Sequence, residues 1–463
     1  MTKTYQLNSE LHHTLREQLR LFAFDDEAQV PSDLISQMQK DLSKRERLET
    51  LLQGELDFHG EDSGYASHDL HAFAAKFPPQ LPRAFIRGLT NRGDTILDPM
   101  VGSGTTIVES LLEGRVGIGL DIDPLAIQLC RVKTTLLDIA EVKKTGAEVV
   151  FTAKNSLREV KNIDQGLNNQ FDPKTKDFID YWFNKETQLE LLALSMAISQ
   201  VQNMSIRHFL ELTYSSIIVT KSGGVTKARD LAHSRPHLDK TKNPKDAIEQ
   251  FISRLRKNID SLAQLKQDSG RAYIINTDAR CIPIANETVD LIVTSPPYAN
   301  AIDYMRAHKF SLVWFGKPIN MLSELRAKYI GSERVGNAQF ENLPINVENV
   351  VQELYKRDKK KSAVLRKYYG EMKLVLAEMY RILRKDCPAI VVVGTSTIRE
   401  LDIQTHTCLT DIASELGFQI VGITKRILDR NKRMMPARFG KKSDSMIEQR
   451  MHDEFVIGLL KPS

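Results

Sequence analysis

The sequence predicts an α/β protein in which a doubly wound, mostly parallel sheet is split by a helical insertion and preceded by a helical extension. Short apolar segments with strand character alternate with amphipathic helical segments over residues 71–135, and the alternation resumes at 271–463. The residues between these stretches, 136–270, are mixed polar and mostly helical in pattern. Alternating β and α elements on both sides of a helical stretch indicate one sheet domain that the insertion interrupts.

Composition excludes several classes of protein. The 463 residues suffice for a large core and an accessory lobe, and the net charge of +5 is compatible with nucleic-acid binding without being diagnostic of it. The four cysteines lie far apart without a C-x-x-C pair, so neither a disulfide framework nor a metal site is expected. No apolar run approaches the roughly 20 residues that span a bilayer. The start, MTKTYQLNSELHH, lacks the apolar segment of a secretory signal. We therefore expect a cytoplasmic protein without membrane contacts.

The elements follow in order from the N-terminus. Residues 1–70 are polar and contain two helical segments, SELHHTLREQLRLFAF and PSDLISQMQKDLSKRERLETLLQ, before a loop with Gly60 and Gly64. We interpret this part as an N-terminal helical extension. The stretch 95–140 then predicts a strand, a glycine turn, a helix through IVESLLEG, a strand VGIGLDID and a continuous helix PLAIQLCRVKTTLLDIA.

The glycine turn, DPMVGSGTT, is the first candidate site. Gly102 and Gly104 at a strand-to-helix turn let the backbone approach a ligand, and the helix N-terminus presents free N–H groups. The turn lacks the third glycine of the dinucleotide fingerprint and the lysine of a phosphate-binding loop. Glycines that serve only the geometry of the turn are the alternative.

An acidic strand end follows this turn. An acid at the end of the second strand can accept hydrogen bonds from both hydroxyls of a ribose, and Asp121 is our candidate for that role. Asp123 is either a second ligand group or the N-cap of the next helix, because Pro124 suits the first helical position.

The third candidate site is Thr294-Ser295-Pro296-Pro297-Tyr298, directly after the apolar strand VDLIV. Two prolines remove N–H donors and leave carbonyls free to face a ligand. Oxygen acceptors of this kind suit an exocyclic base amine, since holding its hydrogens makes the nitrogen more nucleophilic. Tyr298 offers a ring on which a base swung out of its helix could stack. The alternative is a simple proline turn.

The last part of the chain carries the remaining elements. After an irregular, basic stretch, the sequence predicts a long helix LRKYYGEMKLVLAEMYRILRK, a strand AIVVVG, a helix through CLTDIASELG, and two strands, FQIVGITKRIL and EFVIGLLK. Basic residues also cluster in the insertion, in a run at 356–367 and in another at 430–442. They are either solvated faces or phosphate contacts, and the nucleic-acid candidates are Lys227, Arg229 and Arg235.

DPMVGSGTT, GLDIDP and TSPPY together resemble the amino-methyltransferases that modify DNA at cytosine N4 or adenine N6. HAFAAKFPPQLP and NTDA are similar to two further cofactor motifs of that family. The resemblance implies a Rossmann-like methyltransferase sheet and S-adenosylmethionine as cofactor, with 71–135 as the cofactor half, 136–270 as a target-recognition insertion and 271–463 as the catalytic half. Met100 departs from the family, whose members usually carry Phe there. The catalytic residues that it implies are Ser295, Pro296, Pro297 and Tyr298, and the cofactor-binding residues are Phe77, Pro78, Asp98, Pro99, Gly102, Gly104, Thr105, Asp121, Ile122, Asp278 and Ala279.

The serine before P-P-Y implies cytosine N4 in duplex DNA as the target, with the base flipped out. Adenine N6 in DNA and a guanine N2 amine in transfer RNA are the enzymatic alternatives, and a catalytically silent DNA-binding protein is the alternative from another class. The implied partners are DNA and either a cognate restriction endonuclease or components of a defence system.

Overall fold

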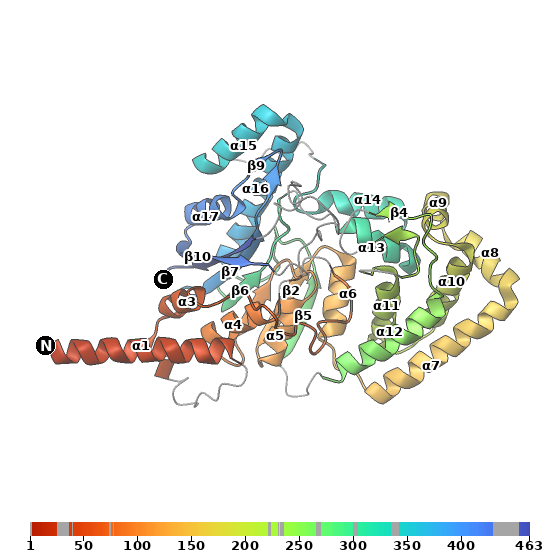
Figure 1. The fold of residues 1–463 in the computed structure, drawn as a ribbon, viewed down its shortest axis with the longest axis horizontal. Coiled ribbons are helices and arrows are strands. Elements are labelled where there is room, and N and C mark those ends of the chain that lie inside the picture. Colours follow the sequence, from red (N-terminus) through yellow and green to blue (C-terminus); the bar gives the residue numbers. More distant parts are fainter. Residues whose placement is uncertain are drawn as a thin grey trace.

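The fold was examined in a computed structural model of the chain (Figure 1). It describes residues 2–25, 37–38, 40–73, 76, 78–220, 224–229, 231, 236–264, 270–299, 304–334, 342–428 and 453–463.

A seven-stranded sheet forms the centre of the described structure, in the order β10-β11-β7-β6-β1-β2-β5. β5, β2, β1, β6 and β7 pair in parallel, whereas β11 pairs antiparallel with both β7 and β10. This is the doubly wound α/β sheet that the sequence predicts, and the prediction of fold class is confirmed. The strands are β1 (Thr95–Asp98), β2 (Val116–Asp121), β5 (Arg271–Asn276), β6 (Leu291–Thr294), β7 (Pro388–Gly394), β10 (Gln419–Ile427) and β11 (Asp453–Leu460).

Helices cover both faces of the sheet, because successive strand residues point to opposite sides. Ile96 of β1 packs on the side of α3 (Lys44–Leu52) and α4 (Gln80–Leu89). Its neighbour Leu97 packs on the other side. The helices on that other side are α15 (Ile345–Arg357), α16 (Lys359–Ile382) and α17 (Thr405–Glu415).

Five further elements complete the described sheet domain. The N-terminal helix α1 (Thr2–Phe24) packs against α3 and α4 and extends to the left in Figure 1. Helices α5 (Thr105–Leu112) and α6 (Pro124–Lys133) connect β1, β2 and the insertion, and β8 (Thr397–Ile398) pairs with β9 (Leu401–Asp402).

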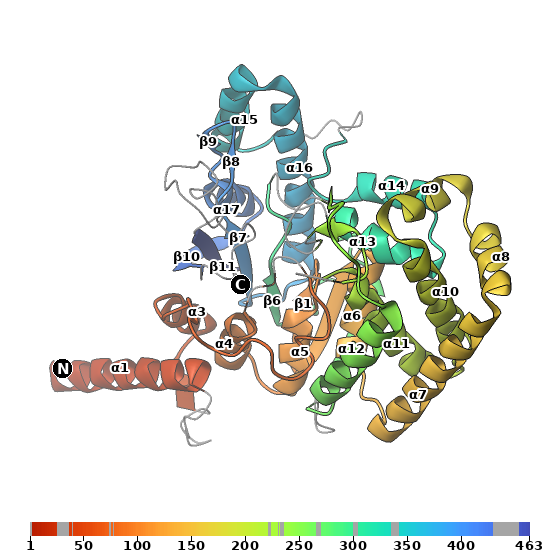
Figure 2. The same cartoon turned by 45° about the vertical axis from the view of Figure 1, so that its right-hand side comes forward.

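The residues between α6 and β5 form a helical body at one side of the sheet (Figure 2). Its apolar core also takes in α13 (Met305–Leu312), η2 (Val313–Phe315) and α14 (Ile319–Lys328), which follow β6. The catalytic half of the chain therefore contributes to the core of the insertion. The insertion elements are α7 (Ile139–Ser156), η1 (Leu157–Glu159), α8 (Val160–Gln170), α9 (Pro173–Trp182), α10 (Lys185–Ser199), α11 (Met204–Ile218), β3 (Ala228–Arg229), β4 (His237–Leu238) and α12 (Ala247–Leu262).

The structure corrects two of our expectations about helices. The helix predicted through PLAIQLCRVKTTLLDIA stops at Lys133, where the Thr134 hydroxyl donates to the Cys130 carbonyl at 2.9 Å. A new helix begins after Asp138, whose carboxylate caps it by accepting from the Ala140 N–H at 2.8 Å. The stretch before α16, which we expected to be irregular, contains α13, α14 and α15. Among the described helices, none combines the length and apolar character that crossing a membrane requires.

Candidate cofactor and catalytic site

Four of the sequence-predicted segments meet at one edge of the sheet. Asp98, Asp121, Asn276 and Thr294 are the last residues of β1, β2, β5 and β6. Because these strands are parallel, their carboxyl ends lie together, and this is the edge at which open α/β sheets bind ligands.

The glycine turn lies between β1 and α5. Gly102 and Gly104 adopt left-handed conformations, with φ of 46° and 80°. A Cβ atom on Gly104 would lie 2.9 Å from the Cys130 Sγ atom, so the turn needs glycine both for its backbone angles and for space. Thr105 opens α5 and is buried, with its hydroxyl 2.9 Å from that of Ser103. The turn keeps the N-terminus of α5 close to the sheet edge.

Asp121 closes over this turn from β2. One carboxylate oxygen accepts from the Gly102 N–H and the other from the Asp123 N–H, both at 2.9 Å. Burial, together with the neighbouring Asp123 carboxylate, raises the pKa of Asp121 to about 7. The side chain stays partly exposed, and a carboxylate oxygen can accept a second hydrogen bond. A glycine cradle with an acid beside it suits the chemistry of a nucleoside.

Asp123 caps α6, which resolves the alternative that the sequence left open. Its Oδ1 accepts from the Leu125 N–H at 2.8 Å, and its Oδ2 lies 2.6 Å from Nδ1 of His308. Burial opposes ionisation of Asp123, but His308 holds its pKa below the usual value. Asp123 therefore supports the loop rather than facing a ligand.

Asp98 joins the glycine turn to the catalytic motif. The Thr294 hydroxyl donates to Oδ1 of Asp98 at 2.7 Å, and the Met100 N–H donates to the same oxygen at 3.2 Å. Burial raises the pKa of Asp98 to about 6. Since Thr294 directly precedes Ser295, this contact sets the position of the catalytic motif relative to the turn.

The predicted catalytic motif, 295–298, directly follows β6, and its tyrosine lies against the end of β7. Ser295 and Pro297 are partly exposed, whereas Pro296 and Tyr298 are buried. The Tyr298 hydroxyl donates to Oε1 of Glu454 at 2.7 Å, and burial followed by Glu454 raises the pKa of this phenol well above its usual value. A Cβ atom on Gly394 would lie 2.5 Å from the Tyr298 ring, so one side of the ring is closely covered.

Sequence reasoning missed Gly394 and Glu454. Both lie on strands far along the chain, and no local motif marks them.

Asp278 lies in the loop after β5. Its carboxylate forms two hydrogen bonds with the Arg280 guanidinium, at 2.6 and 2.9 Å, and Arg280 also pairs with Glu371 of α16 at 2.5 Å. Burial opposes ionisation, but Arg280 keeps the pKa of Asp278 below its usual value. Ala279 beside it is buried. The acid proposed to meet the adenine amine is thus held by a neighbouring cation, which the sequence did not signal.

Aromatic residues also lie against the glycine turn. Phe73 stacks on Tyr304 with ring centroids 5.3 Å apart, and a Cβ atom on Gly102 would lie 3.3 Å from the Phe73 ring. Phe77, the expected cofactor contact, lies outside the described residues, and Pro78 is buried just before α4. Pro99 follows β1, and the partly exposed Ile122 separates the two acids of the second strand end.

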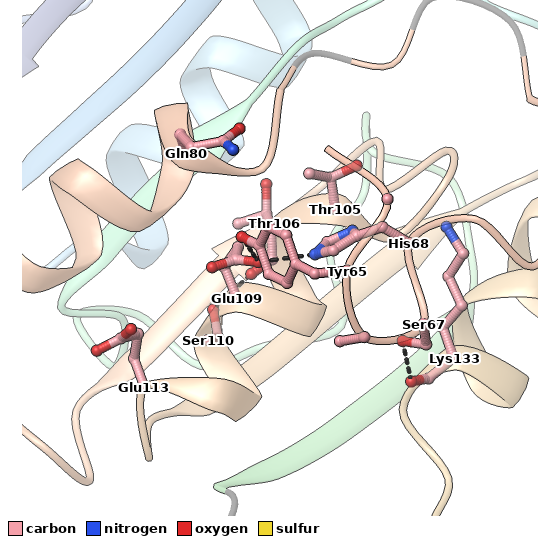
Figure 3. Close-up of polar contacts among 12 residues, drawn as sticks. Tyr65, Ser67, His68, Gln80, Thr105, Thr106, Glu109, Ser110, Glu113 and Lys133 are labelled. Carbon is pink, nitrogen blue, oxygen red and sulfur yellow. Dashed lines mark hydrogen bonds and ion pairs between the residues drawn. The ribbon is translucent and has the colours of Figure 1, made fainter. Parts of the chain in front are cut away.

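A buried polar cluster lies beside the glycine turn, on α5, at the end of α6 and in the segment before Phe73 (Figure 3). Glu109 of α5 accepts from the Tyr65 hydroxyl and from Nε2 of His68, both at 2.7 Å. Lys133, fully buried at the end of α6, donates to the Ser103 carbonyl of the turn at 2.8 Å. Burial lowers the pKa of both His68 and Lys133 well below their usual values. The segment before Phe73 and the end of α6 thereby hold the glycine turn in place.

The described basic candidates for DNA binding lie in the helical insertion and not at the carboxyl ends of the strands. In the insertion, Arg229 is exposed and pairs with Asp239 at 2.8 Å, while Nζ of Lys227 donates to the Asp180 carbonyl at 3.2 Å. Arg235 and the run at 430–442 lie outside the described residues.

The basic run at 356–367 is largely neutralised. Four of its basic residues each pair with a glutamate: Lys356, Lys361, Arg366 and Lys367. The run is therefore mainly a solvated surface whose charges are paired within the protein.

Comparison with known proteins agrees with this geometry. A family model described as a DNA methylase matches residues 22–131. The chain is 23% identical over 385 residues to Type II methyltransferase M.MvaI of Kocuria varians, covering 77% of this chain and 83% of that protein. It is 24% identical over 358 residues to Type II methyltransferase M.MjaII of Methanocaldococcus jannaschii, covering 59% and 67%. Over 91 residues it is 38% identical to Type II methyltransferase M.BglI of Bacillus subtilis, covering 20% and 26%. The chain is thus similar to DNA methylases over residues 22–131 and, along most of its length, to Type II DNA methyltransferases.

Proposed function

We propose that this chain transfers the methyl group of S-adenosylmethionine to the exocyclic N4 amine of cytosine in duplex DNA. The observation that carries the proposal is the contact between Thr294 and Asp98, which holds Ser295-Pro-Pro-Tyr beside the glycine turn. A serine rather than an acid stands at the first position of that motif. An amine acceptor site and a nucleoside cradle are thus neighbours on one sheet edge.

The cofactor residues of this proposal are those of the sheet edge. Asp121 would accept the ribose hydroxyls, Gly102 and Gly104 would allow close approach of the backbone, and Asp278 would accept the adenine amine. Asp98 and Thr105 would act through the turn, because both are buried in contacts inside the protein. Pro78 and Phe77 would border the methionine end.

The catalytic residues act on the target base. Ser295 and the Pro296 carbonyl would accept the two hydrogens of the amine, which concentrates its lone pair on nitrogen. When bound, the cofactor supplies an electrophilic methyl group on a sulfonium. The amine would gain positive charge as it takes up that methyl group and would then release one proton to solvent. Hydrogen-bond acceptors at Ser295 and Pro296 stabilise the positive charge that develops on nitrogen before that release.

Tyr298 would hold the flipped base by stacking. Gly394 covers one side of its ring, so a base has only the other side available. The hydrogen bond to Glu454 anchors the hydroxyl end of the ring, and burial together with Glu454 keeps the phenol neutral. A ring held in advance loses little conformational freedom when the base stacks on it.

Nucleoside analysis tests the choice of base. DNA from cells that express the protein would be digested and its nucleosides separated by mass spectrometry, beside DNA from cells expressing Ser295→Ala. The proposal expects N4-methylcytosine in the first sample only. N6-methyladenine in its place would establish the adenine alternative. Methylated guanine in RNA would establish the transfer RNA alternative, and cofactor binding without any transfer would establish a silent binding protein.

We further propose that the chain is the modification enzyme of a restriction–modification system, since its relatives are described as Type II methyltransferases. A restriction endonuclease of the same DNA sequence specificity would be the partner. Protection of host DNA from that endonuclease after expression of this chain, and its loss in the Ser295→Ala variant, is the direct test.

Affinity for S-adenosylmethionine is expected to fall as the pH drops below about 7, the value to which burial raises the pKa of Asp121. Ribose hydroxyls bind the charged carboxylate, so protonation of Asp121 competes with the cofactor. One proton lowers the affinity by up to about tenfold per pH unit below the pKa. Calorimetric titration on both sides of this pH measures the effect. Asp121→Asn should remove the dependence, and a flat profile for the parental protein would contradict the assignment.

Neutralising Lys227, Arg229 and Arg235 together is expected to weaken DNA binding and flatten its salt dependence. Each lost phosphate contact lowers the slope of log K against log salt by about 0.9. Arg229 should contribute less than this, because Asp239 already pairs with it. Fluorescence anisotropy at several salt concentrations measures the slope. Lys154→Gln, an exposed lysine elsewhere on the insertion, is the matched control, and an equal slope in all proteins would make the three residues ordinary surface charge.

A further inference from the structure

His308 is a buried residue that lies against Asp123 and Phe73, beside the proposed cofactor site. It lies on α13, the first described helix after the catalytic motif, and its ring is only 2% exposed. Its Nδ1 atom is 2.6 Å from Oδ2 of Asp123, which is itself buried. A buried carboxylate at this distance requires a donor, so Nδ1 carries a proton and donates it.

Asp123 transmits this contact to the cofactor acid. Its side chain caps α6 through the N–H groups of Leu125 and Ala126, and its backbone N–H donates to Oδ1 of Asp121 at 2.9 Å. The orientation of Asp123 therefore determines the direction of one of the two hydrogen bonds that hold Asp121. Tyr329 also hydrogen-bonds the Asp123 side chain, but without His308 this buried carboxylate would lose its imidazole donor, and the loop would relax to compensate.

The surroundings of His308 belong to the same site. Its ring packs against Phe73 with centroids 5.1 Å apart and lies 6.0 Å from the Tyr304 ring on its own helix. Phe73 in turn abuts Gly102 of the glycine turn. His308 thus touches, directly or through one residue, both the acid loop and the glycine turn.

We propose that His308 is a positioning residue for the cofactor site: through Asp123 it sets the orientation of Asp121. This inference rests on the proposed role of Asp121 in binding the ribose. It assigns no chemical step to His308. The consequence is that cofactor affinity depends on a donor at position 308 and not merely on a ring that fills the space.

Two substitutions separate a donor from packing. His308→Phe keeps a planar ring against Phe73 but has no donor, and His308→Asn restores a donor near the position of Nδ1 with less packing. We expect His308→Phe to raise both Kd and KM for S-adenosylmethionine by about tenfold, in line with one hydrogen bond to a charged group. At saturating cofactor its kcat should stay near the parental value. His308→Asn should recover most of the affinity despite its smaller side chain.

Two controls accompany these variants. Tyr214→Phe removes the donor of another fully buried ring, whose hydroxyl donates to the Leu191 carbonyl at 3.1 Å within the insertion. It should leave Kd for the cofactor unchanged even where the thermal unfolding temperature falls. Asp121→Asn tests the proposed ribose contact itself in the same calorimetric titration.

The outcomes distinguish the inference from its premise. Loss of affinity in His308→Phe with recovery in His308→Asn supports positioning. Parental affinity in His308→Phe while Asp121→Asn binds poorly would overturn the role of His308 and keep that of Asp121. Parental affinity in both would overturn the ribose assignment and the inference with it. Equal losses in His308→Phe and Tyr214→Phe would show that loss of any buried donor has the same effect, which also overturns the inference.

Discussion

Replacing Ser295 with alanine is expected to slow single-turnover methyl transfer to DNA by about 30- to 1,000-fold, equivalent to about 2–4 kcal/mol of transition-state stabilisation. The hydroxyl would face the amine at which positive charge develops, and alanine offers no acceptor there. Ser295 directly follows a buried strand, but its own side chain is partly exposed. Loss of its hydroxyl should therefore leave the fold in place. Affinity for S-adenosylmethionine should remain parental, because Ser295 has no proposed contact with the cofactor.

The measurement pairs rapid-quench transfer with calorimetric cofactor binding on the same preparations. Ser295→Thr, which keeps a hydroxyl, is the matched control and should retain much more activity than Ser295→Ala. Transfer by Ser295→Ala at the parental rate would show that the motif is only a proline turn.

Tyr298 requires a more careful substitution than its position in the motif suggests. Alanine would remove about 1–3 kcal/mol of base stacking, but it would also open a cavity beside Gly394 and strand Glu454 without its donor. Tyr298→Phe keeps the ring and removes only the hydroxyl, so a loss of activity in Tyr298→Ala that far exceeds that in Tyr298→Phe is the result expected for stacking, provided that both variants remain folded.

Asp121→Ala is expected to weaken S-adenosylmethionine binding by one to three decades. Two charge-assisted hydrogen bonds to the ribose would be lost, at a combined cost of about 2–4 kcal/mol. The loop would also lose the acceptor that joins the Gly102 and Asp123 N–H groups. Isothermal titration calorimetry at a pH above about 7, where the Asp121 carboxylate is charged, gives the full effect.

A second acid distinguishes a ribose contact from general loss of charge. Asp62 is exposed and its carboxylate accepts from the Gly64 N–H in its own loop, so Asp62→Ala changes the net charge equally and should bind the cofactor normally. Unchanged affinity in Asp121→Ala would remove this residue from the cofactor site and would direct attention to the remaining strand ends.

Local chemistry explains which elements the sequence could predict. The strands β1, β2, β6 and β7 are short apolar runs, and the glycine turn carries its own conformational requirement in Gly102 and Gly104. The missed helix α15 does have a local signal. Val347, Val351 and Leu354 repeat at helical spacing and are buried, but the surrounding lysines and arginines concealed the pattern.

Contacts between distant residues explain what was missed at the site. Tyr298 meets Glu454 and Asp123 meets His308 across more than 150 positions of chain. Neither partner carries a local pattern, since a glutamate on a strand or a histidine on a helix is most often part of the surface or the core. The same holds for two glutamates that neutralise the run at 356–367, Glu333 in the loop after α14 and Glu348 of α15.

The sequence by itself determined the doubly wound sheet, the order of its motifs and the strand ends at which they lie, because apolar periodicity and glycine turns are encoded within a few neighbouring residues. Only the tertiary structure decided which groups face one another there. It placed Asp98 against Thr294, Asp123 against His308 and Arg280 against Glu371. The reason is physical: a hydrogen bond or an ion pair depends on distance in space, which the strand order and the helical insertion set, and not on separation along the chain.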